Sequence, residues 1–125
     1  MQVSGPDGPR FRLNTEREAA LRQIAELERE FTAIAASAAD GSAGGDDEHD
    51  PEGATVAFER QHVAALLAQA RGSLAAIDAA LSKIDVGGYG TCERCGEPIA
   101  AERLAARPAA LLCIRCAAGR RPGRD

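Results

Sequence analysis

The sequence predicts a mainly α-helical protein, in which a long antiparallel coiled-coil helical hairpin is followed by a small cysteine-rich finger. Two stretches carry apolar residues in alternating steps of four and three, the period of a coiled-coil helix. A second observation is the set of only four cysteines, confined to the last third of the chain. The 125 residues include no Trp, one Tyr and three Phe, so a large compact core is hard to build. Paired helices are therefore favoured over a sheet-based fold.

The first helix is predicted from Thr15 to about Ala39. Thr15 and Glu18 have the spacing of an N-terminal capping box. Residues 1–14 contain two glycines and two prolines and are predicted to be a flexible N-terminal segment. One face of the helix is apolar, and its members are Ala20, Ile24, Leu27, Phe31, Ile34 and Ala38. This helix has one face to bury.

The second helix is predicted to begin at Asp50 and Pro51, which resemble an N-cap followed by proline at the first helical position. It should end near Asp85, because Gly87 and Gly88 follow. Its apolar face is formed by Val56, Val63, Leu67, Ala70, Leu74, Ile77, Leu81 and Ile84. Residues 40–53, here called the acidic loop, connect the helices and are rich in glycine and carboxylates. A connection this short predicts an antiparallel hairpin over residues 15–86.

The four cysteines form two Cys-x-x-Cys pairs, Cys92 with Cys95 and Cys113 with Cys116. Seventeen residues separate the pairs, which is a zinc-site spacing because each pair supplies two thiolates from one tight turn. We expect one structural Zn²⁺ in a finger spanning residues 87–117. Two disulfides and a redox-active thiol pair are the alternatives, but neither a secretory signal nor a strand-helix-strand pattern accompanies the cysteines.

Charge is unevenly distributed along the chain. Residues 1–91 carry a net charge of -7, whereas residues 92–125 carry +3 and end in a basic tail over residues 118–125. A negative overall charge without interleaved aromatic residues argues against independent DNA binding. No apolar run of membrane-spanning length is expected, so the chain is predicted to be cytoplasmic. A four-sulfur zinc site leaves no open position for catalysis, and no other catalytic constellation is present, so we expect no enzyme.

Three segments of the finger carry a resemblance to a known family. Residues 89–96 read YGTCERCG, residues 103–108 read RLAARP, and residues 112–116 read LCIRC. Together they closely resemble the zinc finger of the DksA/TraR family of bacterial transcription regulators. The preceding helical hairpin also matches the layout of that family.

The resemblance implies a factor that binds RNA polymerase directly, without reading DNA. In better-known members the coiled coil enters the secondary channel and places acidic residues near the catalytic centre. By this resemblance Asp47 and Asp50 correspond to the two aspartates of the family's tip motif, although Glu52 replaces its alanine. Arg107 matches a position that in some members helps to bind the alarmone ppGpp with polymerase. Those members carry a lysine where this chain has Ala117, which argues against a ppGpp response.

Other interpretations of the residues stay open. The acidic loop is equally well explained as a solvated connection, and Asp50 as an N-cap alone. The chain is then a zinc-ribbon adaptor that binds another protein through its helices or its finger. A third hypothesis is thiol-based sensing, in which oxidation of the cysteines ejects zinc. Each hypothesis depends on a different part of the chain.

Overall fold

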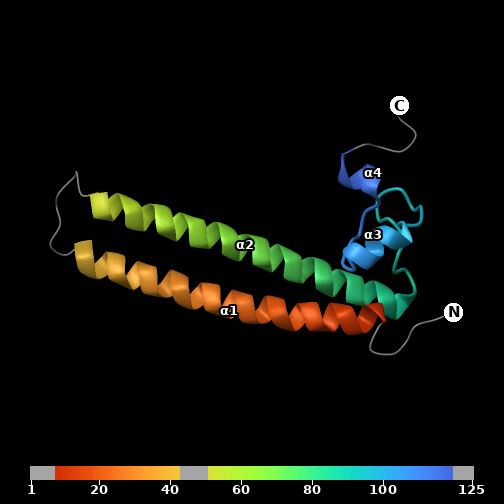
Figure 1. Cartoon of the computed structure of the whole chain (residues 1–125), viewed down its shortest axis with the longest axis horizontal. Coiled ribbons are helices and arrows are strands. Elements are labelled where there is room, and N and C mark those ends of the chain that lie inside the picture. The colour runs from red at the N-terminus through yellow and green to blue at the C-terminus, as the bar shows by residue number, and fades with distance from the viewer. Residues whose placement is uncertain (1–7, 43–50, 120–125) are drawn as a thin grey trace. The chain divides into compact units, whose positions relative to one another are not determined.

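The computed structural model describes residues 8–42 and 51–119, and these form four helices and one isolated β-bridge (Figure 1). The helices are α1 (Pro9–Ser42), α2 (Pro51–Val86), α3 (Ala101–Ala106) and α4 (Ile114–Ala117). The chain divides into two compact units, one made of residues 20–72 and the other of residues 1–19 and 73–125. Both units contain part of α1 and part of α2. The predicted fold class, a helical hairpin with a four-cysteine finger, is confirmed.

In the unit of residues 20–72, α1 and α2 are antiparallel and bury the apolar faces that the sequence predicted (Figure 1). Three residues of each helix are less than 9% exposed: Ala20, Ile24, Leu27, Val63, Leu67 and Ala70. Phe31 and Ile34 continue the same face and are half-buried. An ion pair between Arg71 and Glu28, 2.7 Å apart, flanks this seam at the surface. Such exposed pairs contribute little, so apolar burial holds the helices together.

In the unit that contains both ends of the chain, the start of α1 lies against the end of α2. Leu13 and Ala80 are completely buried and Ile77 is 4% exposed. Ion pairs join Arg17 to Asp78 at 2.6 Å and Arg10 to Asp85 at 3.0 Å. The earlier residue of α1, Arg10, pairs with the later residue of α2, Asp85, and this reversed order is the register of an antiparallel pair.

The first helix begins earlier than the sequence predicted. Pro9 is its first residue, and the N–H of Arg12 donates to the carbonyl of Gly8 at 3.1 Å, so Thr15 lies inside the helix. Proline suits the first helical position because its missing N–H would have no partner there. The flexible segment predicted for residues 1–14 is therefore wrong from Pro9 onward, while residues 1–7 lie outside the described residues. Burial of Leu13 accounts for the extra turns.

Replacing Leu13 with Ala is expected to destabilise the protein by about 2–5 kcal/mol, since the cavity left by a fully buried leucine is not refilled. Urea unfolding of Leu13→Ala and of the exposed neighbour Asn14→Ala measures the difference. Equal stability of the two variants would show that the helical seam begins after residue 14.

The second helix begins at Pro51 as predicted and ends at Val86 through a glycine cap. Gly87 has a φ of 87°, in the left-handed region that glycine adopts without strain. Its N–H donates to the carbonyl of Ile84, and the N–H of Gly88 donates to that of Lys83. These two bonds are a Schellman motif, which satisfies carbonyls at the helix end and turns the chain into the finger.

One expectation about the second helix was wrong. The segment Gly53–Val86 is long and apolar enough to cross a membrane by length and composition, and an 18-residue window within it reaches a mean hydropathy of 1.2. Those two criteria are also met by the core helices of soluble proteins. Arg71 and Asp78 within this segment form ion pairs with residues of α1, as expected of a helix paired with another helix. The apolar residues of the segment supply the seam.

Candidate metal centre

The first cysteine pair lies in a tight turn that directly follows the glycine-rich connection from α2. The N–H of Gly96 donates to the carbonyl of Cys92 at 3.0 Å, and the N–H of Cys92 donates to the carbonyl of Glu97 at 2.8 Å. Gly96 has a φ of 77°, a conformation that side chains rarely adopt. The β-bridge between Thr91 and Pro98 closes the base of the turn. This geometry turns Cys92 and Cys95 to the same side.

The second cysteine pair lies at the start of the short helix α4. Cys113 is the N-cap of this helix and Cys116 lies in its single turn, which the N–H of Ala117 closes on the carbonyl of Cys113 at 2.8 Å. The two pairs are connected by a backbone hydrogen bond from the N–H of Glu93 to the carbonyl of Leu111 at 2.9 Å. This bond places residues eighteen positions apart in the sequence side by side.

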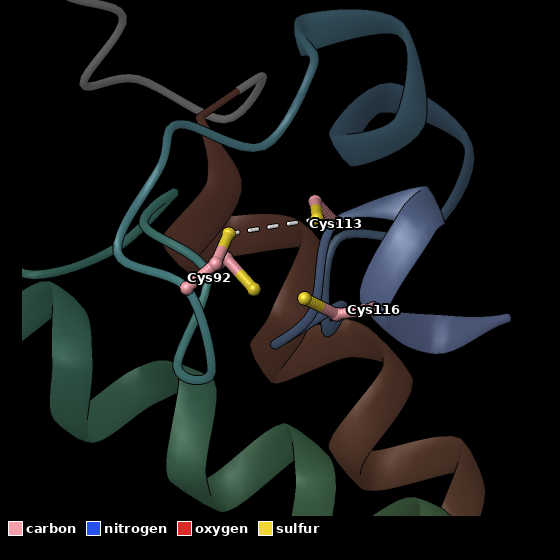
Figure 2. Close-up of side chains that lie close together, drawn as sticks. Cys92, Cys113 and Cys116 are labelled. Atoms are coloured by element: carbon pink, nitrogen blue, oxygen red, sulfur yellow. Dashed lines mark hydrogen bonds between the residues drawn. The ribbon is translucent and has the colours of Figure 1, made fainter. Parts of the chain in front are cut away.

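The four sulfur atoms converge on one point. All four Sγ atoms lie within 4.8 Å of one another, and those of Cys95 and Cys113 are 3.8 Å apart. Figure 2 shows the side chains of Cys92, Cys113 and Cys116 turned toward a common space. Tetrahedral zinc with sulfur at about 2.3 Å places its ligands about 3.8 Å apart. The donors and their spacing therefore fit one Zn²⁺.

Such a site is structural because its four thiolates fill the coordination sphere. Cys92 and Cys116 are each 2% exposed, and with Ile99 they form the buried core of the finger. Leu104 and Leu112 pack against this core and are partly exposed. A core this small cannot hold thirty residues in one conformation without the metal.

The four thiols differ in pKa in the metal-free finger. Burial, together with hydrogen bonds to the three neighbouring thiols, raises the pKa of Cys116 to about 12. Burial also raises the pKa of Cys92, but hydrogen bonds from the backbone of Cys113, Cys95 and Arg94 outweigh it and lower the pKa to about 6. The pKa of Cys113 is also lowered, chiefly by a hydrogen bond from the backbone of Cys116. Metal binding must therefore displace protons mainly from Cys95 and Cys116, whose pKa values are raised.

Three side chains around the metal centre were not singled out by the sequence analysis. Arg103 Nε donates to the carbonyl of Leu112 at 2.9 Å, and an Arg94 guanidinium nitrogen lies 3.4 Å from the carbonyl of Cys116. Tyr89 donates its hydroxyl hydrogen to the carbonyl of Pro108 at 2.8 Å. Burial raises the pKa of Tyr89, so it stays a neutral donor. The sequence feature that could have indicated these three residues is their position next to the cysteines and the Ala-Arg-Pro element.

The other predicted site residues are not all placed. Arg107 is exposed and lines a hollow of about 660 Å³ on the finger together with Arg94, Arg103 and Ala117. Asp47 and Asp50 of the acidic loop lie outside the described residues. The structure therefore brings the four cysteines together and leaves the role of the two aspartates as a prediction.

Comparison with known proteins identifies the finger. Residues 87–121 match the family described as the prokaryotic dksA/traR C4-type zinc finger. Forty residues are 52% identical to the RNA polymerase-binding transcription factor DksA of Haemophilus influenzae, covering 32% of this chain and 28% of that protein. An uncharacterized protein of Aquifex aeolicus is 53% identical over 45 residues, which are 36% of this chain and 31% of that protein. The chain thus matches less than a third of the length of these relatives.

Two solved structures are similar over most of the chain. Transcription factor DksA2 from Pseudomonas aeruginosa is 29% identical, with 94% of this chain and 89% of that one covered and a TM-score of 0.49. The DnaK suppressor protein from Agrobacterium tumefaciens is 30% identical, with 85% and 91% covered and a TM-score of 0.43.

Proposed function

This chain belongs to the DksA/TraR family of C4-type zinc-finger proteins, and we propose that it regulates transcription by binding RNA polymerase. The observation that carries the proposal is the finger itself, which has four converging sulfurs and matches the dksA/traR C4-type zinc finger. A factor named for polymerase binding is 52% identical to this chain over 40 residues. Zinc has a structural part in this function. It fixes the finger against the ends of α1 and α2 within one compact unit.

The two long helices supply the reach that a channel-binding factor needs. With 34 and 36 residues at about 1.5 Å each, α1 and α2 have contour lengths of roughly 50 Å. Their seam is apolar and their outer faces are charged, which suits helices surrounded by the polar walls of an enzyme channel. We propose that this hairpin enters the secondary channel of polymerase.

The acidic loop is the proposed acting part. Residues 40–53, whose ends at 40–42 and 51–53 belong to α1 and α2, contain six carboxylates. Asp47 and Asp50 among them correspond to the aspartates of the family motif. Carboxylates are suitable ligands for the hard Mg²⁺ ions of a polymerase, and they repel phosphates that approach the same site. Such a loop changes initiation without catalysing a reaction of its own.

The remaining segments have supporting parts in this proposal. Residues 87–117 form the finger, residues 118–125 are a basic tail, and the protein acts in the cytoplasm together with polymerase. Specificity for promoters then comes from polymerase and not from DNA contacts of this chain. Ala117 is exposed and offers no charge beside Arg107, so no ppGpp response is proposed.

A competition titration tests the proposal. Zinc-loaded protein is titrated against core RNA polymerase in the presence and absence of a known secondary-channel ligand. Saturable binding that the ligand displaces supports the proposal. Binding that the ligand leaves unchanged would favour the adaptor hypothesis, and no binding would overturn the polymerase assignment.

A further inference from the structure

The second cysteine pair has little local structure to hold it. It follows the seventeen residues 96–112, here called the excursion, which contain the six-residue helix α3. Helix α3 has no side-chain cap and no buried residue. The helix α4 that carries Cys116 has only four residues and no side-chain cap at Cys113. Short uncapped helices are marginal in water. Contacts from elsewhere in the finger must therefore position Cys113 and Cys116.

We propose that Arg94 and Arg103 are positioning residues for the zinc centre, each holding a backbone carbonyl within or directly before the second cysteine pair. Arg103 donates through Nε to the carbonyl of Leu112 at 2.9 Å, directly before Cys113. Arg94 donates to the carbonyl of Cys116 at a longer 3.4 Å. The two bonds flank the pair on both sides, so together they restrain the backbone from which both sulfurs project.

The Arg103 bond is the stronger of the two. Its length is typical of a good N–H···O bond, and the charged donor roughly doubles its strength relative to a neutral one. Arg103 is half-buried and lines a hollow of about 730 Å³ together with Cys95 and Cys113, so its bond is partly shielded from water. It ties α3 to the chain that enters the second pair. The excursion thereby acquires one fixed point beside the metal.

Arg94 has a counterpart in the second cysteine pair, Arg115, which has the same sequence context but makes different contacts. The two pairs read Cys-Glu-Arg-Cys and Cys-Ile-Arg-Cys, so Arg94 and Arg115 occupy the same place in each. Only Arg94 reaches across to the other pair. Arg115 is exposed and makes no side-chain hydrogen bond or ion pair within residues 8–42 and 51–119. Arg115 is therefore the matched control for Arg94.

Arg107 is the corresponding control for Arg103. It lines the same hollow as Arg103, Cys95 and Cys113, so removing it changes the nearby charge by the same amount. Its side chain forms no hydrogen bond to a residue in the described part of the chain. A loss confined to Arg103→Ala thus reports the bond to Leu112 and not the loss of a positive charge.

The expected result concerns metal affinity and geometry. Removing a group that orients metal ligands costs roughly 10–100-fold in metal affinity. We expect Arg103→Ala to weaken Zn²⁺ binding by about tenfold or more. Arg94→Ala should reduce Zn²⁺ affinity less, because the hydrogen bond of Arg94 is longer. The Zn²⁺ affinities of Arg107→Ala and Arg115→Ala should stay within about twofold of that of the parent protein. Arg103→Lys keeps a donor within reach of the carbonyl and should recover part of the loss.

The experiment measures Zn²⁺ transfer to a chromophoric chelator for the full-length protein and each variant. Absorption of the Co²⁺-substituted proteins reports the geometry at the four sulfurs, a readout that a change in stability alone does not move. A reduced or shifted Co²⁺ spectrum in Arg103→Ala, partly restored in Arg103→Lys, supports the proposal. Equal affinities in Arg103→Ala and Arg107→Ala, or an unchanged Co²⁺ spectrum, would overturn it. Neither outcome depends on whether the protein binds polymerase.

Discussion

Removal of zinc is expected to unfold residues 87–119 while leaving most of α1 and α2 helical. The finger buries only Cys92, Ile99 and Cys116 as a connected core, so the metal must supply most of its stability, on the order of 10 kcal/mol in small metallodomains. The helices bury their own seams in both units and keep them without the metal. Hydrogen exchange read by mass spectrometry, before and after chelation, measures protection along the chain.

Two controls make the zinc experiment specific. Chelator presaturated with Zn²⁺ should leave protection unchanged, and restoring Zn²⁺ to the depleted protein should return it. Cys116→Ser should behave like the chelated protein, whereas Ala118→Ser, at an exposed position two residues on, should not. If the finger kept its protection after complete loss of zinc, the small core would be sufficient and the structural role of the metal would be wrong.

Replacing Asp47 and Asp50 together with Asn is expected to abolish the effect on transcription while leaving polymerase binding within a few-fold of the parent protein. The substitution removes two negative charges from the acidic loop and keeps the size of the side chains. Affinity should persist because the helices and the finger are unchanged. Open-complex lifetime and promoter output in a purified transcription assay measure the effect, and a titration measures binding.

The acidic loop offers a matched control for this pair. Glu48 and Glu52 lie within the same residues 40–53, Glu52 in the first turn of α2, and carry the same total charge, so Glu48→Gln with Glu52→Gln removes equal charge from other positions. We expect this control to retain most of the activity. A similar loss in both double variants would show that bulk negative charge acts, and full activity in the Asn pair would exclude Asp47 and Asp50 from the mechanism.

The helical seams were predictable because burial follows a period that the sequence displays. The buried residues of α1 and α2 in the unit of residues 20–72 all belong to the predicted faces. The predicted start of α1 at Thr15 was wrong. The capping-box spacing at Thr15 and the glycines and prolines before it indicated a flexible segment, whereas Pro9 is the first residue of the helix. The full burial of Leu13 explains why the helix begins before Thr15, and this burial depends on tertiary packing that the sequence does not display.

The metal centre was predictable for a different reason. Ligands that bind one ion from two tight turns must recur at fixed spacing, and the Cys-x-x-Cys pairs show that spacing directly. The bonds of Arg94 and Arg103 have no such signature, because each reaches a carbonyl whose position depends on how the excursion folds. Sequence spacing reveals groups that share a ligand, whereas groups that orient them appear only in three dimensions.

The most direct test of the account places a photo-crosslinking amino acid at position 49, between Asp47 and Asp50, in the zinc-loaded protein bound to RNA polymerase. The account predicts crosslinks to polymerase segments that line the inner end of the secondary channel, lost when a channel ligand is added in excess. Crosslinks confined to the outer surface of polymerase, formed by a protein that still binds tightly, would contradict insertion of the hairpin.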